Sequence, residues 1–435
     1  MRIGVIGSGR VGLVTGACLS SLGHEVACMD ADAAKIATLR DGRTPFHEPE
    51  LDDLVRRGTD NASLMFLDSV EEVVKDADVV MICVGRPPVG ADDRSLSAVE
   101  SAARAVAGAA RQGVVVVVKS TVPPGTSGHV AHAMRSERPD LACSVVSSPE
   151  FLREGHAVED TLRPERIVVG AADDRGRQVL EQMYAPLVAA GHRLVLTDPR
   201  TAELAKLASN AFLATKVSFA NGLARVAELA GADVVGVTEI MGMDARIGPG
   251  FLGAGLGYGG YCLPKDIVTL ERTAGRLGYD FGLLREVVRI NDEAGEVVAR
   301  IVEEAVWNLE GKRIALLGVA FKAGTDDVRS APALTLARTL LAAGATLTAW
   351  DPLAAEAAAA ELPELSFAAD PYAAVVGANC AVVCTEWPEL TELDLPHLAG
   401  AMAEAVLVDA RNAVDPDAAR GAGFRYVPIG RPQPS

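Results

Sequence analysis

The hydrophobic positions in the first part of the chain fall into short runs rich in β-branched residues, separated by amphipathic or alanine-rich stretches. Short apolar runs of this kind predict buried strands, and strands that alternate with helices are typical of a parallel sheet wrapped by helices. The strands predicted in this way are Arg2–Gly7, Glu25–Asp30, Val79–Val84, Val114–Ser120 and Cys143–Ser147.

The same alternation returns after Lys312, where the predicted strands are Arg313–Gly318, Thr346–Asp351, Cys380–Thr385 and Ala405–Asp409. Between the two sets, Thr201–Ala230 is a long apolar-periodic run without proline, followed by a glycine-rich loop and a second helical run to about Asn308. This pattern predicts an α/β fold in which two Rossmann-like, doubly wound parallel-sheet domains are joined by a long-helix middle domain. The boundaries that we expect are 1–198, 199–308 and 309–435.

The composition is that of a globular chain with enough apolar material for several cores: of 435 residues, 49% are hydrophobic and 23% are charged. The chain has 41 basic and 58 acidic residues, so its formal net charge is −17. Nucleic-acid backbones and anionic membranes call for basic surfaces. We therefore expect neither as a partner, and any local cluster of cations gains significance.

The seven cysteines show no CxxC spacing, which argues against a zinc site and a disulfide framework. We interpret them as reduced thiols of a cytoplasmic protein, and we expect no bound metal. The longest apolar stretches, such as Val114–Val118, are far shorter than the roughly 20 residues that span a bilayer. A glycine-rich motif within the first ten residues also fits no signal peptide.

That motif, GSGRVG at 7–12, follows a predicted strand and opens a predicted helix. In a dinucleotide site Gly7 allows the tight turn, Gly9 lets the diphosphate approach the backbone, and Gly12 lets the helix pack closely. Asp30 ends the next strand, where a carboxylate accepts from a ribose 2′-hydroxyl and repels a 2′-phosphate, so NAD is favoured over NADP. Lys35 either reaches the adenosine side or is a solvated surface lysine. By itself the motif also describes a tight turn without a ligand.

The segment GLGYGGYCLPKD at 255–266 has four glycines in six positions, which suits a backbone wrapped closely around a ligand. A helix is predicted to start near Pro264, so Cys262 would lie close to a helix N-terminus, where the dipole favours a thiolate. The alternative for Cys262 is a small buried hydrophobe, the role that we assign to the other six cysteines.

Two further segments point to the same chemistry. Lys206 and Asn210 are four residues apart and therefore share one face of the predicted middle helix, among alanines and leucines. A lysine there either has a target for its ammonium or extends to solvent. The segment KSTVPPGT at 119–126 joins a strand end to a turn, and ligands bind at such ends in doubly wound sheets.

Taken together, these motifs resemble the UDP-glucose/GDP-mannose dehydrogenase family of nucleotide-sugar dehydrogenases, over nearly the full chain. The matching segments are GSGRVG (7–12), KSTVPPGT (119–126), SPEFLREG (148–155), the helix around Lys206 and Asn210, GYGGYCLPKD (257–266), GVAFKAGTDDVR (318–329) and DARN (409–412). They occur together and in order, which makes the resemblance specific.

The resemblance implies oxidation of a sugar C6 alcohol to a carboxylate in two hydride transfers, with two NAD per substrate. Cys262 would attack the aldehyde intermediate, and the resulting thiohemiacetal would be oxidised to a thioester that water hydrolyses. Lys206 would stabilise the alkoxide and oxyanion with Asn210 as a neutral donor. The positions that would handle protons are Thr121, Glu150 and Asp266, and the sequence leaves open which is the first general base.

The resemblance also implies the ligand contacts. For the cofactor they are Gly7, Gly9, Val11, Gly12, Asp30, Lys35, Arg86, Ser120, Thr121, Glu154, Lys265 and Arg329. For the nucleotide sugar they are Glu150, Phe151, Leu152, Arg153, Glu154, Lys206, Asn210, Arg246, Phe251, Gly253, Tyr258, Gly259, Phe321, Lys322 and Arg411. Arg246 would reach the sugar in a neighbouring subunit, and a homodimer would form through the middle helix, although that helix could also be core within one subunit.

The chain departs from the family pattern at three places. Arg86 stands where the family often has threonine, Tyr261 where serine is common, and Ser330 where a glutamate usually follows the arginine. The first departure affects the expected cofactor contacts of that loop. None of the three removes a residue that the chemistry needs.

UDP-glucose is the leading substrate, and TDP-, GDP- and N-acetylhexosamine nucleotide sugars are alternatives. A two-electron β-hydroxyacid dehydrogenase would share the first domain and a middle-helix lysine, but it would need neither Cys262 nor a second doubly wound domain. A catalytically silent nucleotide-sugar-binding protein should have lost at least one of Cys262, Lys206 and Asp266, and all three are present.

Overall fold

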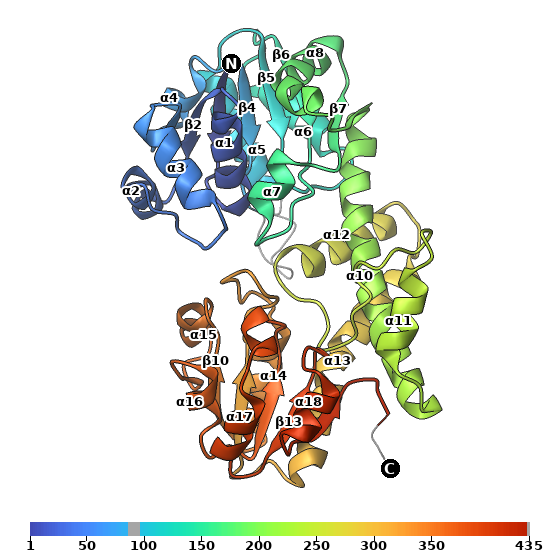
Figure 1. The fold of residues 1–435 in the computed structure, drawn as a ribbon. Helices are drawn as coiled ribbons and strands as arrows, with labels where there is room; N and C mark the ends of the chain where they lie inside the picture. The colour runs from blue at the N-terminus through green and yellow to red at the C-terminus, as the bar shows by residue number, and fades with distance from the viewer. Residues whose placement is uncertain (86–95, 433–435) are drawn as a thin grey trace. The chain divides into compact units, whose positions relative to one another are not determined.

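A computed structural model describes residues 1–85 and 96–432. The chain divides into two compact units, Met1–Ser209 and Asn210–Ser435, each built around its own sheet (Figure 1). Arg86, one of the expected cofactor contacts, lies outside the described residues.

The first unit contains an eight-stranded sheet with the strand order β3-β2-β1-β4-β5-β6-β7-β8. Its neighbouring strands are parallel except for β6 and β7, which are antiparallel. The strands are β1 (Arg2–Ile6), β2 (Glu25–Met29), β3 (Leu64–Leu67), β4 (Val79–Ile82), β5 (Val114–Val118), β6 (Cys143–Ser147), β7 (Ile167–Ala171) and β8 (Leu194–Thr197). The predicted doubly wound sheet is confirmed, and β3, β7 and β8 extend it beyond the strands that the sequence predicted.

Helices cover both faces of this sheet, which explains why its central strands are apolar at every position. Val115 and Val117 of β5 belong to one buried cluster, whereas Val114, Val116 and Val118 belong to another. The helices are α1 (Arg10–Ser21), α2 (Ala33–Arg40), α3 (Leu51–Asp60), α4 (Val70–Val74), α5 (Ser97–Ala109), α6 (Thr126–Glu137), α7 (Ala157–Leu162), α8 (Asp174–Met183) and α9 (Ala185–Ala189).

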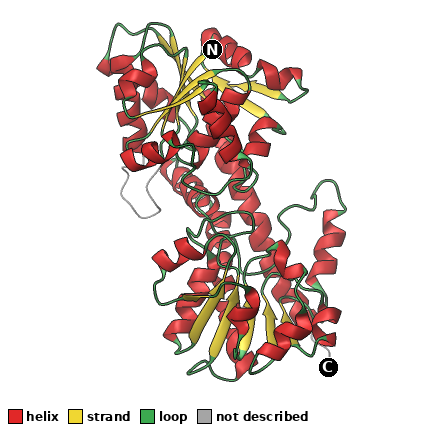
Figure 2. Cartoon of the chain, turned by 60° about the vertical axis from the view of Figure 1, so that its left-hand side comes forward, coloured by secondary structure: helices red, strands yellow, loops and turns green. Residues whose placement is uncertain are grey.

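The second unit contains a six-stranded, all-parallel sheet with the order β11-β10-β9-β12-β13-β14, and helices flank its strands (Figure 2). Its strands are β9 (Arg313–Leu317), β10 (Thr346–Trp350), β11 (Ser366–Phe367), β12 (Cys380–Val383), β13 (Val406–Asp409) and β14 (Arg425–Pro428). The helices around this sheet are α14 (Pro332–Ala342), α15 (Ala355–Glu361), α16 (Pro371–Val375), the 3₁₀ helix η2 (Pro388–Thr391), α17 (Leu395–Ala401) and α18 (Pro416–Gly421).

Four further helices precede this sheet in the chain. They are α10 (Pro199–Ala230), α11 (Val234–Gly242), α12 (Cys262–Arg276) and α13 (Gly282–Val306). The long helix α10 begins in the first unit and continues into the second. The predicted long-helix middle region is therefore present.

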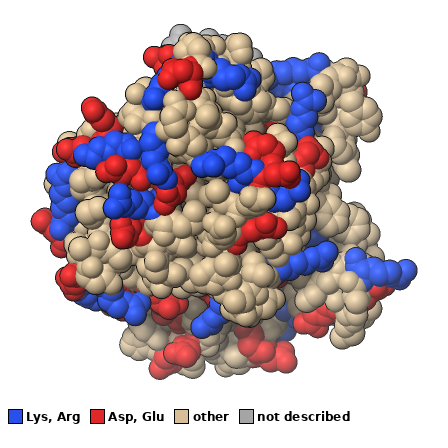
Figure 3. Space-filling model, turned by 90° about the horizontal axis from the view of Figure 1, so that it is seen from above, with Lys and Arg blue, Asp and Glu red and all other residues tan. Residues whose placement is uncertain are grey.

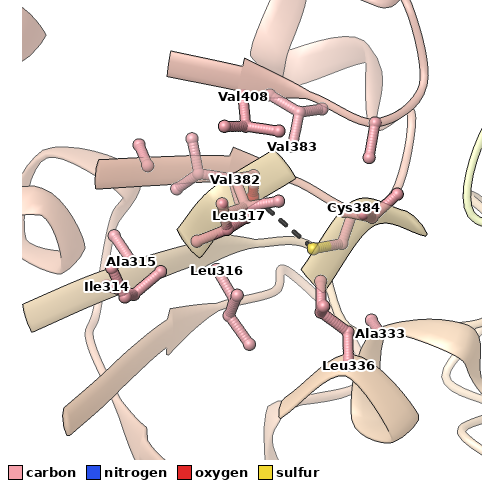
Figure 4. Close-up of a cluster of buried hydrophobic side chains, with 14 of the residues drawn as sticks. Ile314, Ala315, Leu316, Leu317, Ala333, Leu336, Val382, Val383, Cys384 and Val408 are labelled. Carbon is pink, nitrogen blue, oxygen red and sulfur yellow. Dashed lines mark hydrogen bonds between the residues drawn. The ribbon is translucent and has the colours of Figure 1, made fainter. Parts of the chain in front are cut away.

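The core of the second sheet contains two of the seven cysteines, Cys380 and Cys384. In Figure 4, Cys384 packs among apolar side chains of β9, β12 and α14, and its Sγ donates to the carbonyl of Val382 at 3.6 Å. All seven cysteines are described, and none forms a disulfide. Five are buried, whereas Cys143 and Cys262 are partly exposed. The interpretation of six cysteines as small buried hydrophobes therefore holds for all of them except Cys143.

The described residues contain no helix that is long and apolar enough to cross a membrane. Within the same ranges, no group of three or more His, Cys, Asp or Glu side chains is arranged to hold a metal ion. On the face of the molecule seen in Figure 3, Lys and Arg side chains lie intermingled with Asp and Glu.

Candidate active site

The glycine turn between β1 and α1 has the geometry that a dinucleotide diphosphate needs. Gly7 has φ +98°, and a Cβ there would lie 2.9 Å from the carbonyl oxygen of Cys83. A Cβ on Gly12 would lie 1.8 Å from the oxygen of Gly7, so α1 approaches the turn as closely as a glycine allows. Around Gly9, by contrast, a Cβ would meet no atom within 4 Å. The N-terminus of α1 is therefore open at Gly9, and its free N–H groups favour an anion.

Asp30 follows β2 directly and lies against this turn. Its Oδ2 accepts from the N–H of Ser8 at 2.9 Å and from Nζ of Lys35 at 2.8 Å, and its Oδ1 accepts from the N–H of Asp32 at 3.1 Å. Burial raises the pKa of Asp30, but the hydrogen bonds from Lys35 and the two N–H groups outweigh it and hold that pKa below its usual value. Lys35 is thus an ion-pair partner of Asp30.

A buried ion pair joins the SPEFLREG segment to α10 within the first unit. Nζ of Lys206 lies 3.1 Å from Oε1 of Glu150, and both side chains are buried. Oε2 of Glu150 accepts from the N–H of Leu152 at 2.8 Å, and the Lys206 ammonium lies 5.3 Å from the centre of the Phe151 ring. An ammonium and a carboxylate in this arrangement can stabilise an oxyanion and accept a proton, respectively.

Three other expected residues of the first unit, Ser120, Arg153 and Glu154, contact neighbouring segments. The hydroxyl of Ser120 donates to the carbonyl of Val84 at 2.8 Å, and the partly exposed Thr121 follows it. Arg153 forms a two-pronged ion pair with Asp160. Glu154 is buried, with its Oε2 3.5 Å from Nε of Arg10 in the glycine turn. Val11 lies in the first turn of α1.

A second buried cluster lies in the second unit. Asp266 is 0% exposed, and its Oδ2 accepts from Nδ2 of Asn210 at 2.6 Å. The ammonium of Lys265 donates to Oδ1 of the same carboxylate. Cys262 lies one turn before Asp266 and is the first residue of α12, which starts two residues earlier than the proline at which the sequence placed it. A partly exposed thiol at the start of a helix is well placed to react as a thiolate.

The glycine-rich loop before Cys262 is packed tightly against the rest of the second unit. Oδ1 of Asn291 accepts from the N–H of Tyr258 at 2.7 Å. A Cβ on Gly257 would lie 2.7 Å from the same Asn291 oxygen. A Cβ on Gly259 would lie 2.3 Å from the carbonyl oxygen of Ser330. Protein contacts therefore require glycine at these two positions, whatever ligand the loop also meets. Tyr258 is buried, and burial raises the pKa of its hydroxyl.

The expected cations differ in their surroundings. Arg411 is partly buried, and its Nε donates to the carbonyl of Cys384 at 2.8 Å. The guanidinium of Arg329 donates two hydrogen bonds to the carboxylate of Asp327. It also lies over the ring of Tyr261, 4.6 Å from the ring centre. The side chain of Arg246 is 89% exposed and pairs with Asp244.

The remaining expected substrate contacts lie on the loops of the second unit. Phe251 has φ +64° and is exposed, as is Gly253. Phe321 and Lys322 are partly buried. The Phe321 ring lies close to Gly260, because a Cβ on Gly260 would be only 2.9 Å from a carbon of that ring.

Two buried carboxylates of the first unit were not predicted from the sequence. Glu203 on α10 accepts from the first turn of α6, and Glu48 accepts from the N–H groups of Gly155 and Ala157 at 2.8 and 2.7 Å. The signal for Glu203 was available, because it is a glutamate on an apolar helix one turn before Lys206. Glu48 precedes a proline in a loop and offers no comparable pattern.

An open glycine turn with a carboxylate at the end of the next strand is the dinucleotide site of NAD-binding proteins. A cysteine at the start of a helix adds a candidate nucleophile, so these features indicate an NAD-dependent oxidoreductase. The chain matches the UDP-glucose/GDP-mannose dehydrogenase family in its NAD-binding domain at residues 1–188, its central domain at 200–293 and its UDP-binding domain at 315–416. The chain belongs to this family.

Relatives with similar sequences cover essentially the whole chain. A UDP-glucose 6-dehydrogenase of Rhizobium meliloti is 43% identical over 99% of this chain and 100% of its own length. One of Pseudomonas aeruginosa is 42% identical over 100% of this chain and 98% of its own length. A solved UDP-glucose dehydrogenase from Pyrobaculum islandicum superposes with a TM-score of 0.92 at 38% identity, covering 99% of this chain and 97% of its own.

Proposed function

We propose that this chain oxidises the C6 alcohol of UDP-glucose to the carboxylate of UDP-glucuronate, consuming two NAD and one water. The observation that carries the proposal is Cys262 at the start of α12, one turn before the buried Asp266 with its Asn210 and Lys265 partners. A two-electron alcohol dehydrogenase needs no such nucleophile. The UDP-glucose 6-dehydrogenases at about 40% identity over the full length support the substrate.

In the covalent half of the reaction, the Cys262 thiolate adds to the aldehyde carbon and forms a thiohemiacetal. Loss of a hydride gives the thioester, and water then cleaves the carbon–sulfur bond to release the carboxylate and the thiolate. A thiolate suits both steps because it is a good nucleophile and a good leaving group. Lys206 stabilises the negative oxygen in both halves, with Asn210 as a neutral donor.

Protons leave and enter through Thr121, Glu150 and Asp266. Glu150 already contacts Lys206, so the charge of that pair is balanced before substrate arrives. Asp266 accepts hydrogen bonds on both of its oxygens, from Asn210 and from Lys265.

NAD supplies the hydride acceptor for both oxidations when it is bound. The open turn at Gly9 and the Asp30 carboxylate fit its diphosphate and a ribose hydroxyl. Lys35, Ser120, Glu154, Lys265 and Arg329 complete this set in the proposal. In the UDP-binding domain, Phe321, Lys322 and Arg411 hold the nucleotide sugar, and the loop with Gly253, Tyr258 and Gly259 adds backbone contacts.

We further propose a cytoplasmic homodimer formed through α10, in which Arg246 reaches the partner's sugar. Support comes from large apolar side chains that this helix leaves exposed at seven-residue intervals, Phe212, Phe219 and Val226. Leu229 at the end of the helix is 90% exposed. Exposed apolar residues aligned along one helix are typical of a helix–helix interface.

The test is an end-point count of NADH released from limiting UDP-glucose in excess NAD. Two NADH per sugar is the expected result. One NADH would mean that the aldehyde escapes and that the role given to Cys262 is wrong. No NADH from UDP-glucose would reject this substrate, and the same count on UDP-N-acetylmannosamine would then be informative, because a solved UDP-D-ManNAc dehydrogenase from Pyrococcus horikoshii shares 29% identity and a TM-score of 0.88.

A further inference from the structure

Glu203 ties two of the functional segments of the first unit together. The side chain projects from the first turns of α10 and is 1% exposed. Its Oε2 accepts from the N–H of Gly125 at 2.5 Å, and its Oε1 accepts from the N–H and the hydroxyl of Ser127 at 2.8 and 2.6 Å. Three donors from the start of α6 thus converge on one carboxylate from another helix.

Helix α6 has no capping group of its own. Its N-cap is Gly125, with φ +98° and no side chain, and its first turn holds no acidic residue. The unpaired N–H groups of a helix N-terminus need acceptors, and the helix dipole favours a negative charge there. Glu203 meets both needs, so the start of α6 is fixed to α10.

The turn before α6 is therefore held at both ends. At its beginning, the hydroxyl of Ser120 donates to the carbonyl of Val84 at 2.8 Å. At its end, Gly125 donates to Glu203. Thr121 lies between these two anchors. One turn after Glu203 on α10, Lys206 carries the ion pair to Glu150 at 3.1 Å. The first two turns of α10 thus set the positions of both Lys206 and the turn that contains Thr121.

We propose that Glu203 is a positioning residue for the oxidation, holding the Thr121 turn in register with the Lys206–Glu150 pair. This inference rests on the proposed function, which assigns proton handling to Thr121 and Glu150. Both Glu203 oxygens are occupied by donors of α6, so the carboxylate orients its neighbours and takes no part in the chemistry itself. A displacement of a reacting group by about 1 Å can cost up to about 100-fold in rate.

A double-mutant cycle tests this proposal. Glu203→Gln replaces one of the two acceptor oxygens by an NH₂ group that faces an N–H donor of α6, and we expect kcat to fall about tenfold or more. In the Thr121→Ala background the same substitution should change kcat by less than about twofold, because the group that it positions is gone. A purely structural role would give the same factor in both backgrounds and would overturn the proposal, as would an unchanged kcat for Glu203→Gln.

Asp173→Asn is the matched control. The Asp173 carboxylate also caps a helix, α8, by accepting from a serine hydroxyl, that of Ser144 at 2.8 Å, and from the N–H of Gly176 at 2.7 Å. Ser144 lies near the beginning of β6, at the opposite end of the strand from Glu150. This variant should lose stability without losing kcat, and an equal loss of kcat would contradict a positioning role for Glu203.

Ser127→Ala provides a milder variant in case Glu203→Gln does not fold. It removes one of the three donors and keeps the charge, so we expect a smaller decrease of kcat with the same dependence on Thr121. The cycle is run on whichever nucleotide sugar the wild-type chain oxidises. If UDP-glucose is not the substrate, the NADH count shows this, and the double-mutant cycle still tests the role of Glu203.

Discussion

The surroundings of Cys262 differ from those of the cysteines buried in the two units. Cys384 lies in the core of the second unit, where burial raises the pKa of its thiol to about 12 and keeps it protonated (Figure 4). Cys262 instead begins α12 and is partly exposed. The two thiols therefore differ in their surroundings: Cys384 lies between strands, whereas Cys262 lies at the positive end of a helix dipole, which favours a thiolate.

We expect Cys262→Ser to abolish acid formation, with a loss of about 1,000-fold or more in kcat, because the covalent half-reaction loses its nucleophile. Nucleotide-sugar affinity, measured by calorimetry, should change little. Cys143→Ser is the control, since Cys143 is the other partly exposed cysteine and lies at the start of β6. Acid formation at the wild-type rate by Cys262→Ser would exclude the thioester mechanism.

In the loop before α12, packing against protein atoms requires glycine, whether or not a ligand also does. Gly259 lies against the backbone of Ser330 and the ring of Pro332, whereas Gly253 has open space around it. Neither has a positive φ. The two positions therefore differ in the room that a methyl group would find.

Gly259→Ala should destabilise the second unit by about 2 kcal/mol, a typical cost of overpacking, whereas Gly253→Ala should stay within about 0.5 kcal/mol of wild type. Urea unfolding followed by tryptophan fluorescence isolates the effect, because Trp307, Trp350 and Trp387 all lie in the second unit. Equal midpoints for the two variants would show that the loop yields to the added methyl group.

The elements that the sequence predicted are those whose pattern is local. The β-branched runs gave β1, β2, β4, β5 and β6 because a strand buried on both faces is continuously apolar. The half-exposed β8 and the two-residue β11 lack such a signal. The fit of Gly259 against Ser330 and the capping of α6 by Glu203 depend on residues brought together by folding, so no local pattern predicts them. The domain boundaries at 198 and 308 stay a prediction.

In the molecule as a whole, each of the two sheets has a carboxylate directly after the strand that pairs with its first strand, and the two carboxylates differ in their surroundings. Asp351 follows β10 as Asp30 follows β2, and each accepts from the backbone of the turn after the first strand of its sheet. Asp351 has five donors, including the indole of Trp387, and is buried. Asp30 has three donors and keeps 15% of its side chain exposed. Asp30 thus has fewer donors and more exposed surface than Asp351, and the two sheets match an NAD-binding and a UDP-binding domain, respectively.

Helix α10 leaves large apolar side chains exposed, and the proposed dimer would bury them. Phe212 and Phe219 are 65% and 56% exposed. Burying one phenylalanine contributes about 1.5–3 kcal/mol, and a twofold interface buries each side chain in both protomers. In the proposed dimer, carboxylates at both positions would remove this contribution and would add like-charge repulsion across the twofold axis.

We therefore expect sedimentation velocity at micromolar concentration to give wild type a molecular mass of twice 45.3 kDa. The Phe212→Glu/Phe219→Glu variant should have a mass of 45.3 kDa. Trp307→Glu is the control, because Trp307 is 94% exposed and lies outside α10.

If Arg246 reaches the partner's sugar, the monomeric variant should also show a raised KM for the nucleotide sugar. Arg246→Ala should show the same rise in KM while remaining dimeric. A monomeric wild type, or a dimer that survives both glutamates, would contradict assembly through α10. A monomeric variant with an unchanged KM would instead separate the interface from the active site.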